Sequence, residues 1–179
     1  MKAMPNRIAR LSVVLQWICR IALVILPLSM VAAAIYSFRD PSMLAPQFPG
    51  LEIAAPPGPA SLAIVFGLLA VPQLMALFVL WQLERLFGLY RRGDTLTTAP
   101  ALRIRRIGLG VVVAALLSLL LRPVAGAILT LGNPAGERQL VVTLSSADIG
   151  LVLAGGLMVV IGWVMGEAAR IAEENRGFV

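Results

Sequence analysis

The amino-acid sequence predicts an all-α integral membrane protein, with four transmembrane helices in a bundle and both termini in the cytoplasm. Of its 179 residues, 59% are hydrophobic and 13% are charged, whereas soluble domains are about 45–50% apolar and about 25% charged. The chain also contains four apolar runs near the ~20 residues that cross a bilayer. Lipid offers no partner for open backbone groups, so these runs must be helical. The positions of arginine and tryptophan predict a single orientation.

The four spans are expected to form a single membrane domain over residues 1–179. They cover about residues 11–36, 61–83, 107–131 and 149–166. The first run could be a signal peptide, because Lys2, Arg7 and Arg10 precede it. However, Arg20 interrupts it, and it is longer than a signal core of about 7–15 residues. We therefore expect it to be retained as the first helix.

The basic residues predict the orientation, because lysine and arginine accumulate on the cytoplasmic side of a membrane. The loop between the second and third spans is rich in arginine, with Arg85, Arg91, Arg92, Arg103, Arg105 and Arg106. In contrast, the loop between the first and second spans and the loop between the third and fourth spans have only Arg39 and Arg138 between them. This loop, the amino-terminal tail and the carboxyl end are expected in the cytoplasm. The net charge of +6 then indicates contact with anionic headgroups, and no direct nucleic-acid binding is expected.

Three tryptophans give the same orientation independently. Trp17, Trp81 and Trp163 fall at the expected cytoplasmic ends of the first, second and fourth spans. Indole rings favour the headgroup level, where the ring is half buried and the N–H is hydrated. We expect these residues to act as interfacial anchors.

The polar residues beside the spans predict where the helices extend. Thr97 and Thr98 are candidate caps with Pro100 in the first turn, so the third helix is expected to start near Ala99. The fourth helix is expected to run past Gly166 into the polar segment that follows. The loop over residues 37–60 contains six prolines and should be irregular and extended.

Charged residues at the inner edge of the spans form the first candidate site. Arg20 lies one turn deeper than Trp17, and Glu84 and Glu167 flank the other two tryptophans at a similar depth. A cluster of Arg20 with one or both carboxylates is plausible, and intramembrane charges are often functional because they are costly. Alternatively, Arg20 extends to a lipid phosphate and the glutamates are solvated, which is the more ordinary arrangement near the membrane edge.

A second candidate site lies in the outer half of the third span. Pro123 removes a backbone hydrogen bond and is expected to kink the helix. The freed carbonyl and the guanidinium of Arg122 could shape an outward-facing polar pocket with Asp148, at the start of the fourth helix. The alternative is a kinked helix whose arginine contacts the outer headgroups, and it is slightly favoured.

Small residues mark one face of the fourth helix. Gly155, Gly162 and Gly166 are spaced by seven and four residues, which places them on a common face. Such residues let helices approach closely, and packing within the chain is favoured over dimerisation. We interpret this pattern as structural.

The sequence offers no constellation typical of an enzyme, so no catalytic residue, cofactor or metal site is expected. The chain has no histidine, which removes the common catalytic triads and imidazole ligation of haem or zinc. The single cysteine, Cys19, cannot form an intrachain disulfide. Glu173 and Glu174 lie on a polar tail, where solvation is the ordinary explanation.

Two segments resemble the DUF2975 family. The central loop, residues 87–94 and 97–108 (FGLYRRGD and TTAPALRIRRIG), is similar to the middle of that family, and the end, residues 171–179 (IAEENRGFV), is similar to its carboxyl terminus. Arg176 stands where an acidic residue is usual. The resemblance covers the second helix to the end, while the first helix matches only in hydropathy. It implies four membrane helices in the bacterial cytoplasmic membrane and no established activity.

Some family members are encoded beside a small helix-turn-helix repressor, and the resemblance therefore suggests a protein partner of that kind. We expect a non-enzymatic membrane protein that acts through protein–protein interaction at its cytoplasmic face. The basic residues of the central loop, Arg91, Arg92, Arg103, Arg105 and Arg106, would contact this partner or anionic lipid. The alternatives are an accessory or scaffolding subunit of a larger membrane complex and a small transporter or channel.

Overall fold

The computed structural model describes residues 6–41, 44, 48, 50–93, 97–134 and 136–176. Four long α-helices account for most of them. They are α1 (Asn6–Arg39), α2 (Pro59–Arg92), α3 (Thr98–Leu129) and α4 (Ser146–Arg176), and a short 3-10 helix, η2 (Thr130–Gly132), follows α3. Within the described ranges the fold is all-α, as the sequence predicts.

Each of the four helices is long and apolar enough to cross a membrane. They contain 34, 34, 32 and 31 residues, and at a rise of about 1.5 Å per residue they exceed the ~30 Å hydrocarbon core. The predicted extensions are present: α3 begins at Thr98 with Thr97 as its N-cap, and α4 continues to Arg176. The chain therefore has the composition and length of a multi-pass membrane protein.

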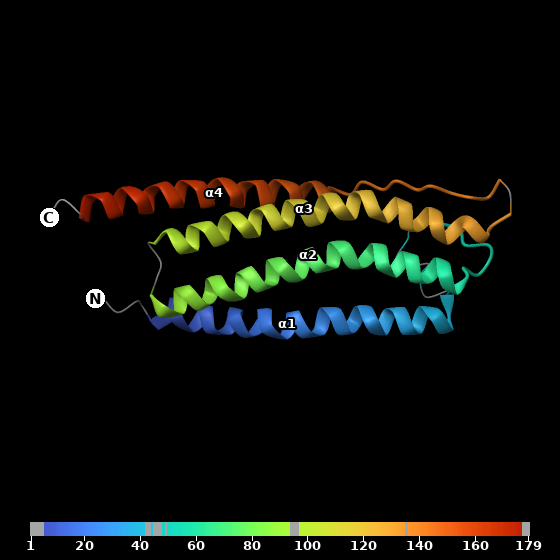
Figure 1. Ribbon diagram of the computed structural model, residues 1–179, viewed down its shortest axis with the longest axis horizontal. Coiled ribbons are helices and arrows are strands. Elements are labelled where there is room, and N and C mark those ends of the chain that lie inside the picture. The colour runs from blue at the N-terminus through green and yellow to red at the C-terminus, as the bar shows by residue number, and fades with distance from the viewer. Residues whose placement is uncertain are drawn as a thin grey trace.

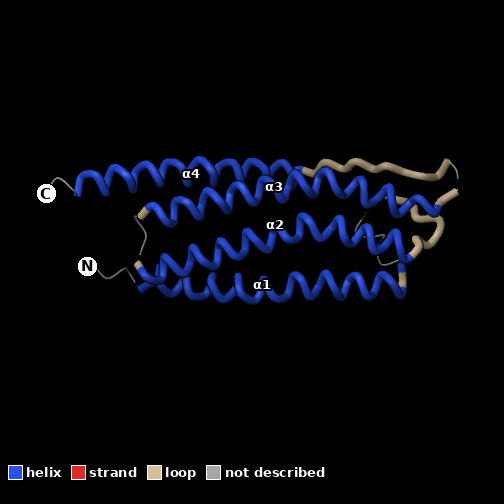
Figure 2. Tube along the Cα trace, in the orientation of Figure 1, coloured by secondary structure: helices blue, strands red, loops and turns tan. Residues whose placement is uncertain are grey.

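The four helices lie side by side in one row in the order of the sequence (Figures 1 and 2). Helix α1 contacts α2, α2 contacts α3 and α3 contacts α4, and no other pair of these helices is in contact in the described chain. The sequence predicted a bundle, and this arrangement differs from one because α1 and α4 do not close the row. Both faces of the row remain open, since large apolar side chains along all four helices are exposed.

The start of α1, the end of α2, the start of α3 and the end of α4 all lie at the left of Figure 1. We call this the inner end, and the opposite end, with the loops 40–58 and 133–145, the outer end. Helix α4 is displaced toward the inner end, where it extends beyond the start of α3 (Figure 1). The segment before α4 instead runs in extended conformation beside the outer half of α3 (Figure 2).

The outer end is covered by the first loop. Leu44 is fully buried and Leu51 is 8% exposed, and both pack with residues of α2 and α3 in one apolar cluster. The side chain of Asn133 holds this loop in place: its Oδ1 accepts hydrogen bonds from the N–H groups of Ala54 and Ala55, at 3.1 and 3.2 Å. The loop is irregular, as expected, but it folds back onto the helix ends instead of extending away. Pro46 and Pro49 lie outside the described residues.

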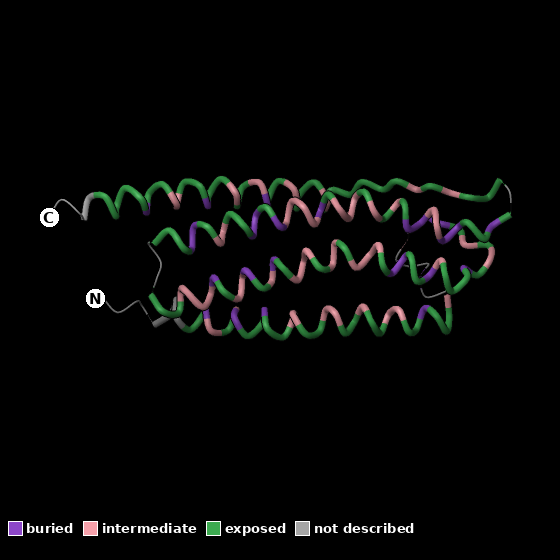
Figure 3. The backbone as a smooth tube through the Cα atoms, in the orientation of Figure 1, coloured by how far each residue is buried: buried purple, intermediate pink, exposed green. Residues whose placement is uncertain are grey.

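Buried residues are concentrated where neighbouring helices meet (Figure 3). At the α3–α4 contact they are small, with Ala101 and Gly108 on α3 and Gly155, Gly162 and Ala169 on α4. A Cβ added at Gly155 would lie 2.8 Å from the carbonyl oxygen of Gly108, and one added at Gly162 would lie 2.7 Å from the backbone N of Arg105. Only glycine allows such close backbone approach. Gly166 is less constrained, with 3.7 Å to the Cβ of Ala101, and Gly108 is a partner that sequence reasoning missed.

The substitution Gly155→Ala should destabilise the α3–α4 contact by about 1–3 kcal/mol, because the added methyl group cannot be accommodated without moving backbone. Gly156→Ala is the matched control: a Cβ there meets no atom within 4 Å, and alanine is the better helix former. Unfolding in mixed detergent micelles, followed by tryptophan fluorescence, measures both variants. Equal stability of the two variants would contradict the close packing.

Candidate functional site

The first candidate site joins α1 to α2 near the inner end. Glu84 Oε1 accepts three hydrogen bonds: from Gln16 Nε2 at 2.8 Å, from Arg20 Nε at 3.0 Å and from a terminal nitrogen of Arg20 at 2.8 Å. The Glu84 side chain is 13% exposed and that of Arg20 is 48% exposed. We call Gln16, Arg20 and Glu84 the inner polar cluster.

Helix geometry explains how the cluster forms. Gln16 and Arg20 are four residues apart and therefore lie on the same face of α1. Both point to the face of α2 that carries Glu84, and Arg85 Nε lies 3.9 Å from the other carboxylate oxygen. A carboxylate with this many donors keeps its charge compensated in an apolar environment. Arg20 is thus paired, and it also lies over the ring of Trp17, with its central carbon 5.5 Å from the centroid.

Glu167 does not take part in the inner polar cluster. It accepts a hydrogen bond at 2.6 Å from Arg170 on its own helix, and both side chains are exposed. Helix α4 has no contact with α1 or α2 in the described chain, so of the two candidate carboxylates Glu84 pairs with Arg20 and Glu167 does not. Similar depth did not bring Glu167 near Arg20 because α2 and α3 lie between their helices.

A neighbouring polar contact joins α2 to α3. Gln82 is 2% exposed, and its Oε1 accepts a hydrogen bond at 2.9 Å from a terminal nitrogen of Arg103. Of the five arginines expected to contact lipid or a partner, Arg103 is therefore partly engaged within the chain. The other four, Arg91, Arg92, Arg105 and Arg106, are exposed. Sequence reasoning missed both Gln16 and Gln82; a glutamine within an apolar run was the available signal.

The three tryptophans each pair with an arginine. The guanidinium carbons of Arg20, Arg85 and Arg105 lie 5.5, 5.7 and 5.4 Å from the ring centroids of Trp17, Trp81 and Trp163, respectively. These distances are within the range of cation–π contacts. Such pairs suit the boundary between headgroups and hydrocarbon, since the ring faces apolar surface and the guanidinium keeps polar N–H groups available.

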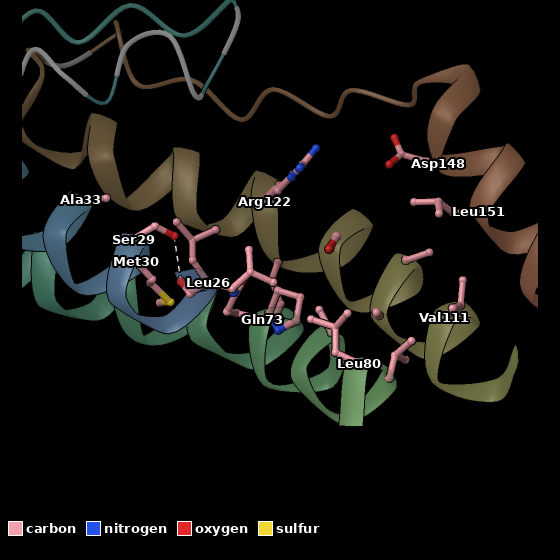
Figure 4. A pocket seen from close by; sticks show the side chains of 18 of the residues that line it. Leu26, Ser29, Met30, Ala33, Gln73, Leu80, Val111, Arg122, Asp148 and Leu151 are labelled. Atoms are coloured by element: carbon pink, nitrogen blue, oxygen red, sulfur yellow. Dashed lines mark hydrogen bonds between the residues drawn. The ribbon is translucent and has the colours of Figure 1, made fainter. Parts of the chain in front are cut away.

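The second candidate site is a cavity of about 750 Å³ nearer the outer end, and all four helices contribute to its walls (Figure 4). Its lining is mainly apolar, with Leu26 and Met30 of α1 and Leu121 of α3 among its members. The polar residues that line it are Ser29, Gln73, Ser118, Arg122 and Asp148. From the sequence, a pocket shared by Arg122 and Asp148 was the slightly less favoured alternative to an arginine at the outer headgroups. Both residues line this cavity, whereas Gln73 and Ser118 were not assigned to it.

Arg122 and Asp148 extend from α3 and α4 toward the same gap (Figure 4). The guanidinium of Arg122 and the carboxylate of Asp148, both of which the structure describes, are not within ion-pair distance of each other. Asp148 Oδ2 instead accepts hydrogen bonds from the N–H and hydroxyl of Ser145, at 3.0 and 2.7 Å. This reciprocal arrangement caps the start of α4. Pro123 lies inside α3, beside a smaller adjoining cavity that also contains Arg122 and Asp148.

The described residues contain no group of three or more histidine, cysteine, aspartate or glutamate side chains that could hold a metal ion. Cys19 is a free thiol and is buried. The two candidate sites are therefore an ion-paired cluster near the inner end and a cavity with polar and apolar lining nearer the outer end.

These features define an α-helical multi-pass membrane protein with a charged inner cluster and an open cavity between its helices. The family model described as protein of unknown function (DUF2975) matches residues 15–176, and the chain belongs to that family. The match includes most of α1, which the sequence motifs did not cover. No curated protein matches the chain, and no solved structure matches it.

The pair Arg20→Gln and Glu84→Gln should show a coupling free energy of about 1 kcal/mol in a double-mutant cycle, because each side chain loses its charged partner. The measurement is unfolding of the purified protein in mixed micelles. The cycle Glu167→Gln with Arg170→Gln is the control, and it should show no measurable coupling because that pair is exposed. Equal coupling in the two cycles would contradict a structural role for the inner polar cluster.

Proposed function

We propose that this protein is a non-enzymatic membrane protein that docks a cytoplasmic protein partner at its inner end. The partner would contact two adjoining parts of the chain. The first is the end of α4, residues 167–176, which we call the arm. The second is the basic surface of Arg91, Arg92, Arg105 and Arg106. A helix-turn-helix regulator is the partner that the family resemblance suggests.

The projection of the arm carries this proposal. Gly166 lies beside Ala101, in the first turn of α3, so the arm extends beyond the point where α3 begins (Figure 1). At about 1.5 Å per residue its ten residues span about 15 Å. Except for Ala169, residues 167–174 are exposed. Because no other helix of the described chain packs along this exposed end of α4, the arm offers a surface to another molecule.

The charges of the inner end favour a salt-sensitive contact. Glu167, Arg170 and Glu174 form a network along one side of the arm, with distances of 2.6 and 4.0 Å. The exposed arginines of α2 and α3 lie at the same end. A partner with an acidic patch and a basic rim would match this distribution, and complementary charge mainly accelerates association and selects the partner.

Deletion of residues 173–179 should reduce capture of the co-expressed regulator at least tenfold in a pull-down from mild detergent, without loss of membrane insertion. The double substitution Glu173→Lys and Glu174→Lys should weaken capture as well, because it reverses the charge of the arm. Glu137→Lys, at the outer end, is the matched control and should bind as the unaltered chain does. Undiminished capture by the deletion would contradict the proposal.

We further propose that the inner end faces the cytoplasm of a bacterial cell, with anionic headgroups around it. The arginine distribution and the three Arg–Trp pairs support this orientation. The arrangement of the helices is consistent with it, because the start of α1, the α2–α3 connection and the end of α4 lie at the same end of the row (Figure 1).

Cysteine labelling tests this orientation, because the chain has one native cysteine. In a Cys19→Ala background, Glu137→Cys should react with a membrane-impermeant maleimide in intact cells. Arg92→Cys should react only after permeabilisation. The opposite pattern would show that the chain is inserted the other way round.

The open row of helices favours an accessory subunit as a second candidate. In the apolar stretch of α1, 6% of the residues are buried, compared with 17% in α2 and in α3. A larger membrane complex could cover this face, and co-purification of a stoichiometric membrane partner would support it. A transporter or channel is less favoured, because the lining of the cavity is mainly apolar and its polar residues, Ser29, Gln73, Ser118, Arg122 and Asp148, are few.

A further inference from the structure

We propose that the cavity between the helices binds one molecule of a zwitterionic aminophospholipid, with its phosphate at Arg122, its ammonium group at Asp148 and an acyl chain along the apolar wall. This site is separate from the inner end and does not depend on the docking of a protein partner there. Three features support it: the shape of the cavity, the unpaired guanidinium and the position of the carboxylate.

The size and lining of the cavity suit a lipid. Its volume of about 750 Å³ falls within the ~300–1,000 Å³ typical of small-molecule sites. Among the α3 residues of its lining, Arg122 lies nearest the outer end and Val111 nearest the inner end. Arg122 and Val111 are eleven residues apart on α3, which corresponds to about 16 Å along the helix. The cavity therefore combines the charge of Arg122 near its outer limit with a long, mainly apolar wall.

Arg122 supplies the site for a phosphate. Its side chain is exposed, and in the part of the chain that the structure describes it has no hydrogen bond or ion pair. A guanidinium without a partner is costly beside hydrocarbon, and it binds phosphate through two parallel hydrogen bonds. Ser118 lies one turn away on the same face of α3, and Gln73 approaches from α2. Both can donate hydrogen bonds to the ester carbonyls of a glycerolipid.

Asp148 selects the type of headgroup. Its Oδ2 accepts both hydrogen bonds from Ser145, whereas its Oδ1 accepts none among the described residues and is available to an ammonium group. The opening therefore presents one positive and one negative charge on two neighbouring helices, α3 and α4 (Figure 4). A headgroup with a phosphate and a primary ammonium matches both charges. An anionic headgroup matches only Arg122 and is repelled by Asp148.

The test is native mass spectrometry of the full chain, equilibrated with equal amounts of phosphatidylethanolamine and phosphatidylglycerol with identical acyl chains. The unaltered chain should retain one phosphatidylethanolamine in at least fivefold preference to phosphatidylglycerol. Arg122→Gln should reduce this retention about tenfold, while Arg122→Lys restores most of it. Arg138→Gln removes an arginine at the outer end that does not line the cavity, and it should retain lipid as the unaltered chain does.

Two further variants separate headgroup selection from loss of the fold. Asp148→Asn keeps an oxygen that can cap α4 and removes the charge, so the preference for phosphatidylethanolamine should disappear while lipid is still bound. Ala114→Phe should fill the apolar wall and reduce retention of both lipids. Equal retention of the two lipids by the unaltered chain, or retention by Arg122→Gln equal to that of Arg138→Gln, would overturn the proposal.

Discussion

The close approach of α3 and α4 is the contact on which the rest of the structure depends. Gly108 and Gly155 face each other across this contact, and Gly162 faces the backbone at Arg105. Because backbone meets backbone, α4 can sit only at one height along α3 without separating from it. That height determines both ends of α4. Asp148 is brought to the wall of the cavity that Arg122 also lines, and the arm is carried beyond the start of α3.

The other two helix contacts rely on polar side chains as well as apolar packing. Glu84 joins α1 to α2 through Gln16 and Arg20, and Gln82 joins α2 to α3 through Arg103. The hydrophobic effect drives little association between helices already in lipid, so directional bonds of this kind specify which helix is the neighbour. Together with the glycines of α3 and α4, they produce a row in which each helix contacts only its neighbours in sequence.

The open row leaves a cavity that a closed bundle would fill. Its walls come from all four helices, yet α1 and α4 do not meet. The inner polar cluster and the Asn133 bonds to the first loop fix the row at its two ends. Binding of a lipid between these two points would complete the packing of the open face. Binding of a protein at the arm would use a different surface, so the two activities are compatible within one chain.

The sequence by itself determined the helices, and the tertiary structure decided their partners. Apolar length and composition specify a helix in lipid because the backbone has no alternative, so the four spans were predictable and the structure confirms four helices long and apolar enough to cross a membrane. The start of α3 was predictable from Thr97, Thr98 and Pro100, because the preference of these residue types for the first turn is local, although the Thr97 side chain makes no capping hydrogen bond.

Side-chain partners were only partly predictable, because hydropathy gives the depth of a residue and not its position around the row. The sequence favoured an Arg20 that extends to a lipid phosphate over a cluster with a carboxylate, whereas the structure pairs Arg20 with Glu84. Glu167 at a similar depth faces solvent beside Arg170. Gly108 carried no signal of its own, since its role comes from the backbone of α4 opposite. Likewise, Gln73 and Ser118 became part of a site only when the packing of the four helices left a space between them.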